Sequence, residues 1–468
     1  MKKDFKNRIT LELFGKLILF LILFYQAGVL VRLVSLMPIY NPIDELYHYD
    51  YILKISEGRG RSSNLNMHPQ ILASICKYGY RATHYHASPP PFENEFEPDL
   101  SMYRINDQIH QHPPLYYWIM SFFISTNATP MTQILNVHGL RLLGVFLFLL
   151  GGFLWISGLC RLVGMGKADI FMLIMLWAWT PPELFRVSND MGVFFVSGLT
   201  IYIYSLTEHE FRRKKPYFSI LLGLCLGACA LTKYTLVYLL LPPLCYGRWR
   251  RHLRMAFLDQ KSDTGRKDVW IKSIRSTFTD PALLVCFVIL LIFLLTKEVG
   301  VNKLKVVGAN PIGWTLKYLS YTLFWGESVW LGQRLAYDIP VVFPILLLVL
   351  FPAGWISAFL FSNRIRRDDA TSKKSGSEHQ APRFIGGMII WMILIQTSIS
   401  IYIIPWFCQG RYLIPVVPLM IALMTVGFYN LGKRFPLVSR RFFAILAVIL
   451  WVYINTQHLS YVIYLMNQ

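Results

Sequence analysis

The sequence predicts an all-α polytopic membrane protein with about eleven transmembrane helices. Of its 468 residues, 54% are hydrophobic and only 15% are charged, and the mean hydropathy is +0.43. A soluble chain of this length needs far more polar surface than this composition supplies. Apolar runs long enough to cross a bilayer of about 30 Å recur along the chain. Residues 1–468 are therefore predicted to form a single transmembrane module.

The first predicted span, 14–37, follows a basic N-terminus. It is long enough to cross a membrane and no small-residue cleavage site follows it, so we expect it to be retained rather than removed as a signal peptide. The two longest polar loops are predicted at 38–133 and 298–338. The other predicted spans are 134–160, 168–185, 190–206, 217–231, 233–247, 280–297, 339–362, 384–404, 411–431 and 442–464.

Positive charge predicts the orientation. Every second connection between spans is rich in Lys and Arg, as are the first eight residues. Basic connections stay on the cytoplasmic side, so the N-terminus is predicted inside and the C-terminus outside a plasma membrane of the bacterial inner-membrane type. This pattern accounts for the net charge of +20 without nucleic acid as a partner. The loop at 38–133, the turn at 188–190 and the junction at 232–233 then share the extracytoplasmic face.

The most informative segment is the one that begins the first loop. Asp44 and Glu45 are adjacent carboxylates directly after the first predicted span. A carboxylate at a membrane surface can act as a general base on a hydroxyl or hold a divalent cation. The alternative is a helix start in which two acidic residues interact with the helix dipole. His48 lies one turn after Glu45, where it could join a metal site or serve as an ordinary hydrogen-bonding neighbour.

An aromatic segment follows in the same loop, at 112–118. Two prolines followed by Leu-Tyr-Tyr-Trp are typical of an amphipathic helix lying at the membrane interface. Tyr116 and Trp118 are expected to form part of an aromatic belt at headgroup level. His112 could face the same cavity as Asp44.

Two cations are predicted on the extracytoplasmic side, where the charge rule does not place them. Lys233 lies at a helix junction and Arg411 at the start of a span. An Arg at this position suits a bidentate phosphate contact, and a Lys suits a point-charge contact. Either side chain alone could instead reach toward lipid headgroups. Finding both on the face that carries an acidic pair favours a role in binding an anionic ligand.

The seven cysteines show no paired spacing, so no zinc site or disulfide framework is predicted. Cys225 and Cys229 are four residues apart in an apolar run and are expected to be small packing residues on one helix face.

Taken together, these motifs resemble the GT-C superfamily of membrane glycosyltransferases, which includes protein O-mannosyltransferases and the transferase that adds aminoarabinose to lipid A. Residues 42–49 are similar to its bacterial Pro-x-Asp-Glu-x-x-His-aromatic pattern, and residues 113–117 to its Pro-Pro-Leu-Tyr-Tyr element. Further along, the resemblance rests on an Asn-Asp turn at Asn189-Asp190, a Thr-Lys-Tyr junction at 232–234 and a Gly-Arg-Tyr-x-x-Pro element at 410–415. The five motifs occur in the family's order.

The resemblance implies a GT-C type fold with juxtamembrane helices in the first extracytoplasmic loop. It implies an inverting transfer of a sugar from a polyprenyl-phosphate donor to an extracytoplasmic hydroxyl on a glycan, lipid or protein. Asp44 is the implied base, with Glu45 as the second catalytic candidate, and Lys233 and Arg411 are the implied phosphate ligands. Some relatives hold a metal at the acidic site, so Mg or Mn could bind at Asp44, Glu45 and His48. The other implied substrate-binding residues are His48, His112, Asn189, Asp190, Tyr234, Gln409 and Tyr412.

Three other functions remain open at this stage. A transporter or flippase for a lipid-linked saccharide would also need cations and a lipid groove, but transporters commonly show internal repeats, and the sequence shows none. A glycan polymerase or ligase would also work outside on lipid-linked saccharides, without needing the Asp-Glu pair after the first span. A purely structural membrane protein is the third alternative.

Overall fold

The computed structural model describes the helical parts of the chain and several of their connections. The described residues are 17, 20–35, 45–58, 67–68, 70–71, 112–126, 129–165, 169–178, 186–210, 216–258, 280–296, 356, 358, 381–402 and 414–434. Every secondary-structure element in these ranges is a helix, as the sequence predicts. The loop predicted at 298–338 and the span predicted at 442–464 lie outside them, as does 339–362 except at 356 and 358.

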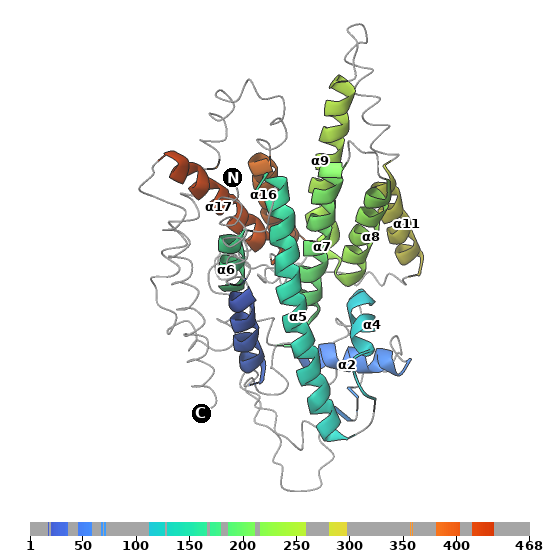
Figure 1. Cartoon of the computed structure of the whole chain (residues 1–468). Coiled ribbons are helices and arrows are strands. Elements are labelled where there is room, and N and C mark those ends of the chain that lie inside the picture. The colour runs from blue at the N-terminus through green and yellow to red at the C-terminus, as the bar shows by residue number, and fades with distance from the viewer. Residues whose placement is uncertain are drawn as a thin grey trace.

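The helical bundle is built around α5 (Pro130–Leu162) and α7 (Asn189–Glu210), which pack along much of their lengths (Figure 1). Their close approach depends on Gly158, because a Cβ atom there would lie 2.9 Å from the backbone of Tyr202. Nearly the whole of each helix, Met131–Leu162 in α5 and Asn189–Glu208 in α7, is long and apolar enough to cross a membrane. The predicted spans 134–160 and 190–206 therefore correspond to real, long apolar helices.

The other helices of the bundle surround this pair. Helix α8 (Pro216–Thr232) packs on α7 and α11 (Pro281–Thr296), and α9 (Thr235–Leu258) packs on α16 (Ala381–Tyr402). Helix α17 (Val416–Arg434) contacts α5, α16 and α6 (Ile170–Ala178). An apolar helix, Phe20–Ser35, falls within the first predicted span. Each of these helices overlaps a predicted span.

The bundle has a large apolar core to which α5, α6, α7, α8, α9, α16 and α17 contribute. Cys225 and Cys229 are buried in it, as expected for packing residues. A second, smaller core lies around α2 (Glu45–Ser56) and α4 (Leu115–Ser121), against the first half of α5. We call α2, α4 and residues 67–68 and 70–71 the cap. Figure 1 shows α2 lying across α5 near the end where α5 begins.

Helix α4 begins after two prolines, as the sequence predicts, with Pro114 at its N-cap. Its amino-acid pattern divides it into two faces, because Tyr116, Tyr117 and Met120 are buried whereas Trp118 is exposed. The exposure of Trp118 agrees with a place in the aromatic belt, whose position at headgroup level stays a prediction. The matching expectation for Tyr116 is wrong: its ring is buried against α7 rather than exposed at a membrane surface.

Candidate functional site

The first part of the candidate site is a buried ion pair at the start of α2. Both carboxylate oxygens of Glu45 accept from Arg141 of α5, Oε1 from Nε at 2.7 Å and Oε2 from Nη2 at 2.6 Å. The backbone N–H of Val187 also donates to Oε1, at 2.7 Å. Glu45 and Arg141 are both completely buried. Bidentate geometry of this kind fixes both partners, and removing one partner of a buried pair typically costs about 3–5 kcal/mol.

This contact defines what Glu45 does. The residue lies in the first turn of α2, as the helix-start interpretation expects. Its charge, however, is balanced mainly by the Arg141 guanidinium from another helix. Because the same carboxylate also binds Val187, it joins α2, α5 and the segment just before α7. Glu45, which follows Asp44 in the sequence, thus holds the beginning of α2 against the bundle.

The second part of the site is a group of imidazole and phenol rings. His48 Nδ1 lies 2.8 Å from the Tyr117 hydroxyl, and the two rings stack with centroids 5.7 Å apart. The centroid of the His112 ring is 6.0 Å from that of His48. The two predicted substrate-binding histidines, 64 positions apart in the sequence, are therefore brought together by α2 and α4. Tyr117 is thus a hydrogen-bonding partner of His48.

The third part is the Asp190–Lys233 ion pair. The Lys233 ammonium contacts Asp190 Oδ1, and both side chains are buried. Ser188 Oγ is 3.4 Å from Asp190 Oδ2, and Asn189 Nδ2 donates to the Thr232 carbonyl at 3.5 Å. The turn before α7 and the junction between α8 and α9 thus meet, as their predicted placement on one face requires. Burial also rules out the alternative in which Lys233 extends toward lipid headgroups.

Tyr116 is buried beside α7, in the neighbourhood of the two ion pairs. Gly192 on α7 leaves room for its ring, because a Cβ atom there would lie 2.6 Å from Tyr116 Cδ2 and 3.4 Å from Thr232 Cγ2. Burial raises the pKa of the Tyr116 hydroxyl above its usual value, and the negative charges of Asp190 and then Glu45 raise it further. Tyr116 therefore keeps its proton at physiological pH, and its hydroxyl can act as a hydrogen-bond donor.

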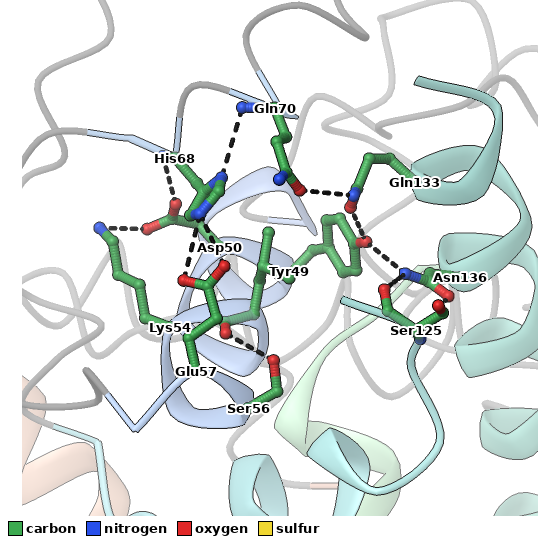
Figure 2. Close-up of polar contacts among 11 residues, drawn as sticks. Tyr49, Asp50, Lys54, Ser56, Glu57, His68, Gln70, Ser125, Gln133 and Asn136 are labelled. Atoms are coloured by element: carbon green, nitrogen blue, oxygen red, sulfur yellow. Dashed lines mark hydrogen bonds and ion pairs between the residues drawn. The ribbon is translucent and has the colours of Figure 1, made fainter. Parts of the chain in front are cut away.

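A polar network farther along α2, from Tyr49 to Glu57, holds residues 67–68 and 70–71 in the cap (Figure 2). Asp50 accepts from the His68 backbone N–H at 2.7 Å and pairs with Lys54 at 2.6 Å. His68 Nε2 lies 3.0 and 3.1 Å from the two carboxylate oxygens of Glu57. The backbone N–H of Gln70 lies 3.3 Å from His68 Nδ1, so both ring nitrogens of His68 have a polar neighbour.

The same network continues to α5. Gln133 Nε2 donates to Gln70 Oε1 at 2.9 Å, and the Tyr49 hydroxyl donates to Gln133 Oε1. Asn136 then donates to the Tyr49 hydroxyl at 3.0 Å and to the Ser125 carbonyl at 2.8 Å (Figure 2). These bonds fix α2, the end of α4 and the first turns of α5 relative to one another. They make the cap a rigid support for the ion pairs beside it.

The structure adds two buried cations that sequence reasoning missed, Arg141 and Arg186. Arg141 lies inside the predicted span 134–160, where an ionisable residue is costly and usually functional. Arg186 precedes the Ser-Asn-Asp turn, on the face where the charge rule does not place cations. Both signals were present in the sequence. The charge rule that identified Lys233 and Arg411 would have identified Arg186 too, and the cost of an ionisable residue inside a span would have identified Arg141.

The remaining predicted site residues are only partly covered. Tyr234 forms the turn between α8 and α9 and is half-buried. Asp44, Gln409, Arg411 and Tyr412 lie outside the described residues, so their predicted roles remain predictions. Among the described residues, no group of three or more His, Cys, Asp or Glu side chains is placed to hold a metal ion. A metal site that includes Asp44 thus also remains a prediction.

Comparisons with protein-family models, curated proteins and solved structures find no match for this chain.

Proposed function

We propose that this chain is an inverting membrane glycosyltransferase of the GT-C type, with about eleven spans and an extracytoplasmic site. It would move a sugar from a polyprenyl-phosphate donor to the hydroxyl of a glycan, lipid or protein. The observation that carries the proposal is the meeting of four sequence motifs in the cap and the adjoining helix ends. The acidic segment, the Pro-Pro-Leu-Tyr-Tyr element, the Asn-Asp turn and the Thr-Lys-Tyr junction are far apart in the sequence, yet they meet where α2, α4, α7 and α8 pack and where Asp190 pairs with Lys233.

The geometry of α5 supports a site at the membrane surface. Its 33 residues give a length of about 50 Å, against about 30 Å of hydrocarbon. Its first turns can therefore reach the headgroup level. Gln133, Asn136 and Arg141 of α5 contact α2 and so hold the cap at this end of the helix. A substrate with a lipid tail and a polar head would meet the buried charges at that level.

In the proposed reaction, Asp44 accepts the proton of the acceptor hydroxyl. The freed oxygen forms a bond to the anomeric carbon while the bond from that carbon to the phosphate oxygen breaks. The leaving polyprenyl phosphate carries away the electron pair, and its growing negative charge is stabilised by Lys233 and Arg411. Attack opposite the leaving group inverts the anomeric carbon.

Lys233 fits this role although it is paired with Asp190. An ammonium group has three N–H donors, so its contact with Asp190 does not by itself prevent it from binding a phosphate. Asp190 would hold the ammonium in place before the donor binds and would reduce its desolvation cost in the empty site. Preformed placement of this kind is what allows a cation to stabilise charge in a transition state.

The experiment that tests the proposal is the protein-dependent release of polyprenyl phosphate. Purified full-length chain is supplied with undecaprenyl-phosphate sugars in lipid vesicles, and free undecaprenyl phosphate is measured. A transferase cleaves the bond between sugar and phosphate. A flippase moves the intact lipid-linked sugar between leaflets and releases none. Movement without cleavage, over a panel of sugars and acceptors, would refute the transferase proposal in favour of transport.

The proposed orientation has its own test. Arg250→Cys should be protected from a membrane-impermeant maleimide in intact cells, because residue 250 belongs to a basic, cytoplasmic connection. A cysteine placed at Asp99, in the first predicted loop, should react. The chain with only its native cysteines gives the background. Labelling at 250 in intact cells would reverse the topology and move the site to the cytoplasmic face.

A further inference from the structure

Helix α4 has an outward apolar face made of four neighbouring side chains. Trp118 is 54% exposed, Ile119 43%, Phe122 68% and Phe123 61%. Trp118 and Phe122 are four residues apart, as are Ile119 and Phe123, so the four side chains project from one side of the helix and the turn that follows it. Trp118 and Phe122 also contact each other edge to face, with centroids 4.9 Å apart. We call these four residues the aromatic face of α4.

The opposite side of α4 is as strongly buried as the aromatic face is exposed. Tyr117 stacks on His48, and Tyr116 lies against Gly192, next to the Asp190–Lys233 pair. Helix α4 packs on α2, α7 and α8, so it stands between the candidate site and the surroundings of the protein. Any movement of the aromatic face is passed to both tyrosines, because they share one short helix.

We propose that the aromatic face of α4 inserts into the outer leaflet of the lipid bilayer. The segment that follows α4 is bound to the first turns of α5, a helix with an outward apolar stripe in which Met131, Leu135, Leu142 and Phe146 are exposed. Asn136, next to Leu135, fixes the end of α4 by accepting from the Ser125 N–H and donating to the Ser125 carbonyl, at 3.0 and 2.8 Å. A stripe of this kind on a helix long enough to span faces lipid, so the surface beside it does too.

The chemistry and the size of the face favour lipid over a protein partner. Tryptophan and other aromatic side chains are enriched at the level where hydrocarbon meets headgroups. Fully buried, aromatic side chains cover about 150–250 Å² each, and these four are already partly covered. Together they offer well under the roughly 800 Å² per partner that a stable protein interface buries. Insertion into a bilayer requires no such minimum buried area.

Insertion would give α4 a second role that rests on the proposed function. The depth of the aromatic face in the leaflet sets the depth of Tyr116 and Tyr117, and hence of the charged groups that they contact. A lipid-linked donor has its phosphate at headgroup level. Helix α4 would thus align the site with the plane in which the donor phosphate lies.

The direct test is photocrosslinking of the full-length chain in vesicles of phosphatidylethanolamine and phosphatidylglycerol. Benzoylphenylalanine at Phe122 should form adducts with the mass of a phospholipid. A dimer-sized product would show that a second copy covers the face, and labelling by neither lipid nor protein would show that it faces water. Either result overturns the inference. The same probe at Phe148, a buried residue of α5, should give no lipid adduct.

A second measurement avoids the bulky probe. Lipids brominated near the headgroup should quench Trp118, so Trp118→Phe should reduce the quenched part of the protein's fluorescence. Trp155→Phe removes a completely buried ring and should leave the quenched part unchanged. Equal quenching of wild type and Trp118→Phe would contradict insertion. Neither measurement requires sugar transfer, so failure of the proposed function and failure of insertion remain distinguishable.

Alignment of the site has a separate readout. Phe122→Ser with Phe123→Ser should lower undecaprenyl phosphate release about tenfold in vesicles but little in short-chain detergent, where no leaflet sets the depth. Phe20→Ser, with a similar exposure of 60% on another helix, is the matched control and should behave as wild type in both. Equal loss of release in vesicles and detergent would assign the two phenylalanines to folding and overturn the alignment role.

Discussion

The two ends of the bundle use the same kind of interaction for different purposes. At the cap end, Glu45 pairs with Arg141 and Asp190 with Lys233. At the opposite end, Arg248 of α9 donates to Asp280 at 2.8 and 2.5 Å from Nε and Nη2. Asp280 precedes α11, and it also contacts His252 and the backbone N–H of Ala282. Both ends therefore contain a buried pair of arginine and carboxylate, although Arg141 contacts both oxygens of Glu45 whereas both Arg248 nitrogens contact Asp280 Oδ2.

The difference lies in what surrounds the pairs. The Arg248–Asp280 pair connects α9, α11 and, through Ser219, α8, and its neighbour Arg251 pairs with Glu208 at the end of α7. These contacts close the ends of helices that are adjacent in the bundle. The pairs at the cap end lie among His48, Tyr117 and Tyr116 and come from the motif segments. Buried charge beside an imidazole occurs at both ends, so it does not by itself mark a site; only the cap end combines it with the motif segments on which the proposed function rests.

The largest expected effect tests whether the two arginine pairs are equivalent for stability. Arg141→Leu and Arg248→Leu should each destabilise the protein by about 3–5 kcal/mol, because each leaves a buried carboxylate without its main partner. Combining them with Glu45→Leu and Asp280→Leu, respectively, should recover most of that loss. Denaturant unfolding in detergent followed by tryptophan fluorescence measures both.

The rescued double variants then separate the two ends. Arg248→Leu with Asp280→Leu should keep undecaprenyl phosphate release close to the wild-type rate. Glu45→Leu with Arg141→Leu should remain strongly impaired even when folded, since the start of α2 is no longer held beside the site. If both double variants are equally active, Glu45 and Arg141 form a structural pair and the comparison fails.

The next effect concerns the predicted base. Asp44→Asn keeps the size of the side chain and removes the proton acceptor, so turnover should fall by about 10²-fold or more without a change in unfolding. Asp99→Asn, in the same predicted loop, is the matched control and should turn over normally. Single-turnover release of undecaprenyl phosphate isolates the chemical step. Near-normal release by folded Asp44→Asn would place the base elsewhere in the site.

A smaller effect is expected where Tyr116 contacts α7. Gly192→Ala places a methyl group 2.6 Å from the Tyr116 ring, which must shift at a cost of about 1–3 kcal/mol. Gly144→Ala is the control on α5, because its new Cβ would meet only Met191, at 3.7 Å. That variant should be neutral or slightly stabilising through better helix propensity. Similar unfolding of the two variants would mean that Tyr116 is not confined by Gly192.

The smallest effect should come from the polar network farther along α2, where His68 contacts Glu57. His68→Leu removes the contact with Glu57, and the expected loss is about 0.5–1.5 kcal/mol with turnover nearly unchanged. Limited proteolysis of the first loop should become faster, because residues 67–68 and 70–71 are held less firmly. Loss of turnover at unchanged stability would instead make the network part of the site.

The sequence alone determined the helical class, the positions of the long apolar helices and the segments that deserved attention. Repeated apolar runs predict helices, because the backbone N–H and C=O groups of a segment in hydrocarbon must hydrogen-bond to each other within that segment. Local patterns also drew attention to His48, His112 and Lys233, and the resemblance to the GT-C family drew attention to Asp190; the roles of all four stay predictions.

Only the tertiary structure decided which of these residues meet. The side chains of Glu45 and Arg141 are 96 positions apart, and those of Asp190 and Lys233 are 43 apart, so no local pattern records either pair. Helix packing likewise turned Tyr116 inward and Trp118 outward, although both belong to one aromatic run. Periodicity shows which residues share a face of a helix, but what that face touches depends on how the helices pack, and on a helix as short as α4 packing sets the direction of both faces.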